Sequence, residues 1–319
     1  MCGAVTGSAA GATQADLLYR FSRRLVQGPR MELQSVGRRA ALLGGLASLV
    51  AAAAPRATAI PIEVANGRCL VPVLLDGRPA RMVLDTGAEL TMVTRAAVAR
   101  LGLRPDPWVS TTLRGAGGLV ERHANVDIRV ALAGPVALFQ NRPGGGLNLP
   151  VTSSDLGGAD GLLGGDILQH YTLDLDIPGA TLALGAMHPP APAPQAVKLQ
   201  LLRRNLLLAP VLLDGHSLTA LVDTGASASL LNARGLYRLG LVPAQVRQDP
   251  AIPMLTVGGE SPARWHRFAE LRVGPLSLRA PAVLTQTVPE AAYDLLLGLD
   301  VLGRQRLYLS YPSLTLAFA

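Results

Sequence analysis

The sequence has few cysteines, lysines and aromatic residues, and these shortages narrow the classes of protein that it can encode. Its 319 residues include only two cysteines, Cys2 and Cys69, which excludes a disulfide framework and a cysteine-based zinc site. Lys198 is the only lysine and is followed by Leu199, so the lysine of a phosphate-binding loop is missing. Aromatic residues make up 4% of the chain, which leaves few side chains to stack on nucleic-acid bases.

The motifs of metal, dinucleotide and serine chemistry are also missing. The five histidines show no His-Glu-x-x-His or similar ligand spacing. Residues 115–120 (GAGGLV) lack the third glycine of a dinucleotide-binding turn, and no Gly-x-Ser-x-Gly surrounds Ser227 or Ser229. We therefore expect no metal, no cofactor and no nucleic-acid partner.

Positive charge is concentrated at the N-terminus. The whole chain has a formal net charge of +7, and residues 1–59 hold seven of its arginines. Arg38-Arg39 precedes an apolar run at residues 41–54, and small residues at 57–59 offer a cleavage site before Ile60. Residues 1–59 are thus predicted to be a targeting segment, with a partial resemblance to a twin-arginine export signal. Met31 is an alternative start that would leave out residues 1–30. We expect an exported, periplasmic protein; an uncleaved anchor or a buried helix are the alternatives.

The most informative feature is an internal repeat. Residues 72–105 (PVLLDGRPARMVLDTGAELTMVTRAAVARLGLRP) align without a gap with residues 210–243 (PVLLDGHSLTALVDTGASASLLNARGLYRLGLVP), and 15 of the 34 positions are identical. Each copy contains Asp-Thr-Gly-Ala, at residues 85–88 and 223–226. One Asp-Thr-Gly is a weak signal, because Asp and Gly are common in surface turns, but its repetition favours a function.

A second repeated pair closes each half of the sequence. Residues 160–168 (DGLLGGDIL) correspond to residues 294–302 (DLLLGLDVL). Each is followed by an alternating segment, at 171–184 and 305–318, that predicts two short strands joined by a Pro-containing turn. A Pro/Ala-rich stretch at 188–196 is expected to be an extended linker. We therefore predict two homologous lobes, residues 60–187 and 197–319.

Within each lobe the pattern predicts mostly strands, so the expected fold class is all-β. Asp76-Gly77 and Asp214-Gly215 each mark the turn of a hairpin that leads to Asp-Thr-Gly. One short helix per lobe is predicted, at residues 95–101 after Thr94 and at residues 233–239 after Asn232. Glycine-rich tips at 114–118 and 257–260 are predicted to end hairpins that bend over a groove.

Two equivalent aspartates at the ends of apolar strands suggest carboxyl groups that meet at a lobe interface. Two carboxylates about 3 Å apart cannot both ionise easily, so such a pair holds one shared proton. One carboxyl group then acts as a general base on water and the other as a general acid toward a carbonyl oxygen. Backbone N–H groups at Gly87 and Gly225 can approach the carboxylates, and the hydroxyl groups of Thr86 and Thr224 can brace each loop.

The paired Asp-Thr-Gly-Ala motifs, each with a later Leu-Leu-Gly, resemble the aspartic proteases, in particular the retropepsin-like family. The resemblance covers about residues 62–319 and implies two retropepsin- or pepsin-like β-barrel lobes with a cleft between them, in a single-chain form of a kind seen in bacteria. It implies Asp85 and Asp223 as the catalytic dyad, with Thr86 and Thr224 hydrogen-bonded across the lobe interface. It also implies a flap over an extended peptide, which would include Gly115, Ala116, Gly117, Gly118, Gly258 and Gly259.

The resemblance therefore predicts an aspartic endopeptidase that acts on peptide or protein substrates as a monomer. Ala88 and Ala226 stand where pepsin-like enzymes carry Ser or Thr, which predicts higher dyad pKa values and a less acidic optimum than that of a gastric enzyme. The alternatives are a non-catalytic peptide-binding module and a structural, export-associated domain. Trp108 and Trp265 are packing residues or line subsites, and a solvated or capping role is expected for the aspartates around Leu-Leu-Gly, namely Asp160, Asp166, Asp294 and Asp300.

Overall fold

The computed structural model describes residues 59–114, 120–132, 146–185, 195–203, 205–256, 259–286 and 292–319, all within one compact unit, Thr58–Ala319. The expected targeting segment, apart from Ala59, and most of the expected linker at 188–196 lie outside these residues. In the described part of the chain, no helix is long and apolar enough to cross a membrane.

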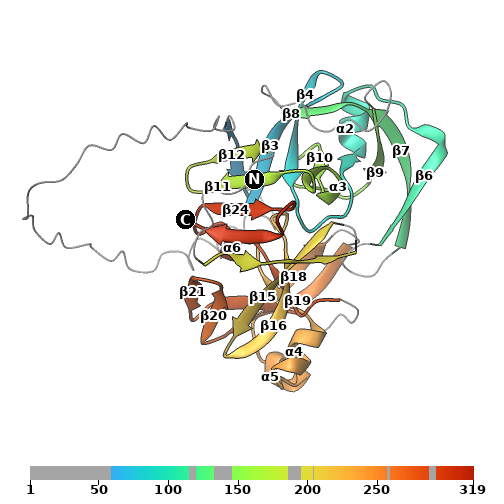
Figure 1. The fold of residues 1–319 in the computed structure, drawn as a ribbon. Coiled ribbons are helices and arrows are strands. Elements are labelled where there is room, and N and C mark those ends of the chain that lie inside the picture. The colour runs from blue at the N-terminus through green and yellow to red at the C-terminus, as the bar shows by residue number, and fades with distance from the viewer. Residues whose placement is uncertain are drawn as a thin grey trace, which may run out of the picture. The chain divides into compact units, whose positions relative to one another are not determined.

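The first half of the chain forms one curled sheet of its own (Figure 1). Hydrogen-bonded neighbours follow the order β2-β3-β4-β10-β5-β9-β7-β6, and β8 pairs with β3. The bounds are β2 Glu63–Ala65, β3 Arg68–Leu75, β4 Arg78–Leu84, β5 Met92–Thr94, β6 Asp106–Arg114, β7 Val120–Ile128, β8 Val130–Leu132, β9 Leu147–Thr152 and β10 Gly161–Leu163.

The second half forms a sheet with a corresponding arrangement. The order is β18-β19-β22-β17-β23-β16-β15-β20-β21, and β14 pairs with β15. The bounds are β14 Gln200–Leu202, β15 Leu206–Leu213, β16 His216–Val222, β17 Leu230–Leu231, β18 Ala251–Thr256, β19 Gly259–Arg267, β20 Glu270–Val273, β21 Leu276–Arg279, β22 Ala282–Thr285 and β23 Leu295–Leu297. Two such β-rich lobes confirm the predicted all-β fold class.

A third sheet joins the halves, because a strand from the first half of the chain pairs with a strand from the second half at its centre. Its order is β1-β12-β11-β24-β25-β13, with bounds β1 Ile60–Pro61, β11 Thr172–Asp176, β12 Thr181–Gly185, β13 Val197–Lys198, β24 Leu307–Ser310 and β25 Thr315–Phe318. Strands β11 and β24 lie side by side in this sheet (Figure 1). Their antiparallel pairing places Asp174 opposite Tyr308. The Thr172 hydroxyl also donates to Ser310 Oγ at 2.9 Å. The strands predicted at 171–184 and 305–318 are therefore confirmed, and they fasten the two halves together.

The predicted hairpins before each Asp-Thr-Gly are present, and their turns have the expected backbone. Asp76 and Gly77 have φ values of 49° and 76°, and Asp214 and Gly215 have 48° and 79°. Two successive positive φ values are typical of the type I′ turn, whose twist matches that of paired strands. This turn joins β3 to β4 and β15 to β16.

Both predicted helices are present, as α2 (Arg95–Arg100) and α4 (Ala233–Arg238). Thr94 Oγ1 accepts the Ala97 N–H at 3.1 Å and Asn232 Oδ1 accepts the Gly235 N–H at 3.0 Å, so both predicted N-caps are confirmed. The prediction of only one helix per lobe is wrong. Three four-residue helices were missed because they are too short to show apolar periodicity: α3 (Gly165–Leu168), α5 (Pro243–Val246) and α6 (Leu299–Leu302).

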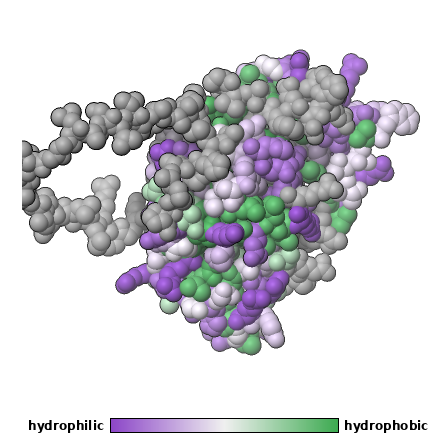
Figure 2. All heavy atoms as spheres, viewed as in Figure 1, coloured by the Kyte–Doolittle hydropathy of each residue, from purple (hydrophilic) through white to green (hydrophobic). Residues whose placement is uncertain are grey.

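The core is built from aliphatic side chains, in keeping with the scarcity of aromatic residues. Leu84, Val222, Leu163 and Leu297, which end the central strands of the two lobes, are all fully buried. On the face drawn in Figure 2, hydrophobic side chains gather near the middle of the described body and hydrophilic side chains surround them.

Candidate active site

Each Asp-Thr-Gly loop begins where a buried central strand ends. β4 leads into Asp85 and pairs in parallel with β10, which contains Leu162 and Leu163. β16 leads into Asp223 and pairs in the same way with β23. The Asp85 N–H donates to the Leu163 carbonyl oxygen and the Asp223 N–H to the Leu297 carbonyl oxygen, both at 3.0 Å. The Leu-Leu-Gly segments thus hold the backbone of each aspartate at the end of its central strand.

The two loops meet so closely that only glycine fits between them. A Cβ atom on Gly87 would lie 2.3 Å from Asp223 Cγ, and one on Gly225 would lie 2.3 Å from Asp85 Cγ. Real Cβ atoms do not approach other heavy atoms so closely, so any larger residue would push the opposite carboxyl group away. The structure therefore brings Asp85 and Asp223 together, although they are 138 residues apart in the sequence.

Backbone N–H groups hold each carboxyl group in place. Asp85 Oδ1 accepts the N–H of Gly87 at 3.0 Å. Asp223 Oδ1 accepts the N–H groups of Gly225 at 2.8 Å and Ala226 at 3.1 Å. These bonds orient the carboxyl groups and favour their ionised form.

The two threonines of the motifs join the loops crosswise. The Thr86 N–H donates to Thr224 Oγ1 and the Thr224 N–H donates to Thr86 Oγ1, both at 3.1 Å. Each hydroxyl group then donates to a carbonyl oxygen of the other half, Thr86 to Val222 and Thr224 to Leu84, both at 2.8 Å. Both threonines are completely buried. The hydrogen bonds implied by the resemblance are present, and they keep the two aspartates in register.

The surroundings of the two carboxyl groups favour a shared proton. Burial raises the pKa of Asp85, against the opposing effect of its hydrogen bonds. Burial and the charge of Asp85 raise the pKa of Asp223 well above its ordinary value. The two groups are close enough to hydrogen-bond to each other, so they titrate as a coupled pair. One proton is retained at a pH where an isolated aspartate would be ionised.

A second layer of hydrogen bonds behind each loop was not found from the sequence. Thr91 Oγ1 donates to Asp166 at 2.6 Å and accepts the Gly164 N–H at 3.0 Å. The other half repeats this arrangement: Ser229 Oγ donates to Asp300 at 2.7 Å and accepts the Gly298 N–H at 3.0 Å. Burial raises the pKa of both Asp166 and Asp300. Each pair locks a Leu-Leu-Gly segment to the loop in front of it.

The aspartates before Leu-Leu-Gly join each lobe's helix to a central strand. Asp160 Oδ2 accepts the Arg81 N–H at 2.9 Å, and its other oxygen lies 2.7 Å from an Arg100 guanidinium nitrogen at the end of α2. Neither a purely solvated role nor a helix cap describes Asp160, which is a link between elements.

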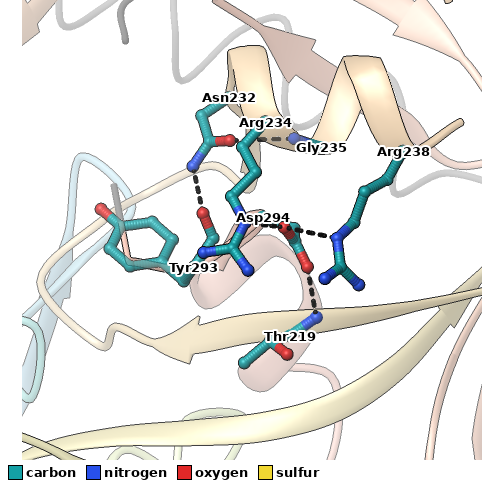
Figure 3. Close-up of polar contacts among 7 residues, drawn as sticks. All are labelled: Thr219, Asn232, Arg234, Gly235, Arg238, Tyr293 and Asp294. Atoms are coloured by element: carbon teal, nitrogen blue, oxygen red, sulfur yellow. Dashed lines mark hydrogen bonds and ion pairs between the residues drawn. The ribbon is translucent and has the colours of Figure 1, made fainter. Parts of the chain in front are cut away.

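Asp294 makes the equivalent link in the second half (Figure 3). It is more deeply buried than Asp160, with no exposed surface. Its Oδ2 accepts the Thr219 N–H at 2.9 Å, and its Oδ1 lies 3.0 Å from Arg234 Nε and 3.4 Å from Arg238 Nε. The predicted solvated or capping role is therefore wrong for Asp294, because two arginines of α4 cover it. The internal repeat was a usable signal, since Asp160 and Asp294 hold corresponding positions.

The other sequence-predicted site residues are placed only in part. Gly115, Ala116, Gly117, Gly118 and Gly258 lie outside the described residues, whereas Gly259 begins β19. The strands on either side of each tip pair as expected, β6 with β7 and β18 with β19.

The two tryptophans differ in exposure. Trp108 on β6 is 90% exposed. Trp265 on β19 is half-buried, and its indole nitrogen has no partner within the described part of the protein. Over the same ranges, no group of three or more His, Cys, Asp or Glu side chains lies close enough to hold a metal ion.

Comparison with known proteins finds one protease family model in each half. Residues 71–167 match the family described as "Aspartyl protease", and residues 209–304 match "gag-polyprotein putative aspartyl protease". No curated protein matches the chain. Each matched range contains one Asp-Thr-Gly-Ala and extends to or past its Leu-Leu-Gly segment. The chain therefore carries two retropepsin-like aspartyl protease domains, one in each half of the sequence.

Proposed function

We propose that the protein is an aspartic endopeptidase that hydrolyses peptide bonds of extended polypeptides through a water molecule activated by Asp85 and Asp223. One observation carries the proposal. The two carboxyl groups meet across the halves, and each is packed against the glycine of the opposite loop. Such contact between like charges is costly unless the pair keeps a proton, and that protonation state is the one that acid–base hydrolysis requires.

The reaction follows from a pair that holds one proton. The ionised carboxylate takes a proton from water, and the resulting hydroxide attacks the carbonyl carbon of the peptide bond. The other carboxyl group gives its proton to the carbonyl oxygen, which yields a neutral tetrahedral diol. The carboxyl group that took the water proton then protonates the amide nitrogen, the C–N bond breaks, and one diol hydroxyl returns its proton to the pair. The dyad ends with one proton, as it began.

The backbone around the dyad supports this cycle. The Gly87, Gly225 and Ala226 N–H groups stabilise whichever carboxyl group is ionised. The crosswise threonines hold the carboxyl groups in one geometry, so little reorganisation is needed when the proton moves.

The remaining parts of the proposal concern partner and location. Both aspartates belong to one chain, so a monomer suffices to build the site. The paired arginines and apolar run in residues 1–59 support export to the periplasm. Peptide or protein chains are the proposed substrates.

The test is a cleavage assay with a diverse peptide library between pH 3 and pH 8. The parent is compared with Asp223→Asn, with and without a statine-type transition-state inhibitor. Cleavage by the parent, lost in the variant and blocked by the inhibitor, is the expected result. Retention of peptides without cleavage at any pH would instead make the protein a binding module.

A further inference from the structure

The second half carries a basic surface segment that has no acidic residue of its own. Residues 233–248 (ARGLYRLGLVPAQVRQ) contain three arginines and neither aspartate nor glutamate. The segment forms α4 and α5, two short helices that lie next to each other at one end of the described body (Figure 1). Its positive charge is therefore gathered in one place.

One face of this segment is fixed to the core, so the opposite face points to solvent. Leu236 of α4 and Val246 of α5 are both 3% exposed and belong to the main core cluster. At the start of α5, Gln245 Oε1 accepts the Val242 N–H at 2.8 Å, and the Gln245 N–H donates to the Val242 carbonyl oxygen at 3.0 Å. The segment thus has a defined conformation on the surface.

The outer face combines apolar side chains with arginines. Tyr237 is 84% exposed and Val242 is 54% exposed. Arg234 lies three residues before Tyr237 and four before Arg238, so the three side chains share one side of α4. Arg247, which follows α5, is exposed as well. We call these five side chains the α4–α5 face.

The positive charge of the α4–α5 face exceeds the negative charge that it meets. Arg234 Nε and Arg238 Nε both pair with Oδ1 of Asp294, so two guanidinium groups share one carboxylate (Figure 3). Each of these arginine side chains remains 45% exposed. Arg247 adds a further positive charge. The face therefore keeps a surplus of positive charge that can attract an anionic partner.

The first half packs in the same way without such a face. In the aligned repeat, Ala96 and Ala99 on α2 stand at the positions of the first arginine and the tyrosine of α4. Only one arginine of α2, Arg100, pairs with the aspartate before Leu-Leu-Gly. The packing of a lobe therefore does not require an exposed ring and two arginines at this place.

We propose that the α4–α5 face docks the protein on a lipid surface that contains anionic headgroups. Arginines are attracted to such a surface, and a tyrosine ring at the headgroup level buries its apolar body while its hydroxyl group stays in water. A nucleic acid would also attract the arginines, but it would find only one ring to stack on and would leave Val242 without an apolar partner. This inference goes beyond the proposed hydrolysis and does not depend on it.

The expected size of the effect follows from single side chains. Arg234 and Arg238 also hold Asp294, so Arg247 is the arginine to replace. Loss of one arginine near an anionic membrane surface should lower the partition coefficient about fivefold. Tyr237→Ala removes a ring that the lipid would cover and should lower the partition coefficient by at least about fivefold. Binding should also weaken in roughly 1 M salt, which screens charges beyond about 3 Å.

The test is sedimentation of the full chain with vesicles of phosphatidylcholine alone and of phosphatidylcholine mixed with phosphatidylglycerol. The variants are Arg247→Gln, Tyr237→Ala and the two combined. Arg95→Gln and Trp108→Ala are the matched controls, because Arg95 is exposed on α2 and Trp108 is 90% exposed on β6. They remove an arginine and an aromatic ring from other parts of the surface.

A local measurement accompanies sedimentation, because residues 1–59 hold arginines and an apolar run that can bind vesicles by themselves. Hydrogen exchange of the full chain is compared with and without the mixed vesicles. Slower exchange is expected in peptides from residues 233–248, and unchanged exchange in those from residues 95–101. The combined variant should lose this protection, whereas both controls should keep it.

Three results would overturn the inference. The first is an absence of vesicle binding, and the second is binding that neither protects residues 233–248 nor weakens in the combined variant. The third is protection of these residues by a soluble polyanion such as heparin but not by vesicles, which would assign the face to a partner other than lipid. None of these results bears on peptide cleavage, which is measured without vesicles.

Discussion

The crosswise threonines give the structure a sharply testable weak point. Thr86→Val keeps the shape of the side chain but removes Oγ1, which donates to the Val222 carbonyl oxygen at 2.8 Å and accepts the Thr224 N–H at 3.1 Å. Thr86 and Thr224 are completely buried, so water cannot replace the lost partner without a rearrangement of the halves. The substitution leaves one buried acceptor and one buried donor unpaired.

The magnitude follows from those two groups. A buried polar group without a partner costs about 1–3 kcal/mol, so the free energy of unfolding should fall by about 2–6 kcal/mol. The total for a folded protein is about 5–15 kcal/mol, so the loss is a large fraction of it. A protein of this size loses about 2–4 °C of melting temperature per kcal/mol. The expected decrease is therefore about 4–24 °C.

The assay is thermal and urea unfolding of the parent, Thr86→Val and Thr86→Ser. Serine retains the hydroxyl group, so Thr86→Ser should lose much less stability than Thr86→Val. The mirror variant Thr224→Val removes the bond to the Leu84 carbonyl oxygen and the acceptor for the Thr86 N–H, and should be destabilised similarly. If Thr86→Val lies within about 0.5 kcal/mol of the parent, an amount usual for surface substitutions, the crosswise bonds do not join the halves as described.

Four further predictions follow from burial and charge. Because the Asp223 pKa is raised, the folded protein holds more protons than the unfolded chain above the ordinary carboxyl pKa, so the free energy of unfolding falls as pH rises through the raised value. Asp223→Asn cannot ionise, and its melting temperature at neutral pH should therefore exceed that of the parent; a lower one would contradict the raised pKa. Raised dyad pKa values also predict a rate optimum well above pH 2, and a profile that peaks near pH 2 would refute this. Asp294→Ala should lower the free energy of unfolding in urea by about 3 kcal/mol, as for a buried ion pair that loses one partner. The loss should exceed that of Asp160→Ala, because the Asp294 side chain is 0% exposed and that of Asp160 is 18% exposed. Equal losses would show that burial does not decide the stability contributed by these two aspartates. Burial raises the Cys69 pKa to about 12, so a thiol reagent at pH 8 should label Cys69 only after denaturation. Because Cys2 is a second thiol, the label is located by peptide mapping, and rapid labelling of Cys69 in the native protein would be inconsistent with its position.

Local chemistry explains why much of this fold could be predicted from the sequence. Turn residues such as Asp76 and Gly77, the N-caps Thr94 and Asn232, and the repeated Asp-Thr-Gly motif act over a few residues. Their geometry is set by their own backbone, so a pattern in the sequence is enough to locate them.

Contacts between segments that lie far apart in the sequence were harder to predict. The sheet shared by the halves depends on the pairing of β11 with β24, and alternation alone predicts a strand but not its partner. The Thr91–Asp166 and Ser229–Asp300 pairs lie far apart in sequence, and only a comparison of the two repeats gives a hint of them. The burial of Asp294 depends on two arginines that approach from α4.

The central claim is that Asp85 and Asp223 act as one unit. The most direct test is kcat/KM on a single cleavable peptide for the parent, Asp85→Asn, Asp223→Asn and the double variant, with inhibitor binding as a check on folding. Residues that work as a unit are strongly non-additive, so each single substitution should lose nearly all activity and the double variant should be no worse. A single variant that retains most of the parent's kcat/KM would show that hydrolysis does not depend on the pair.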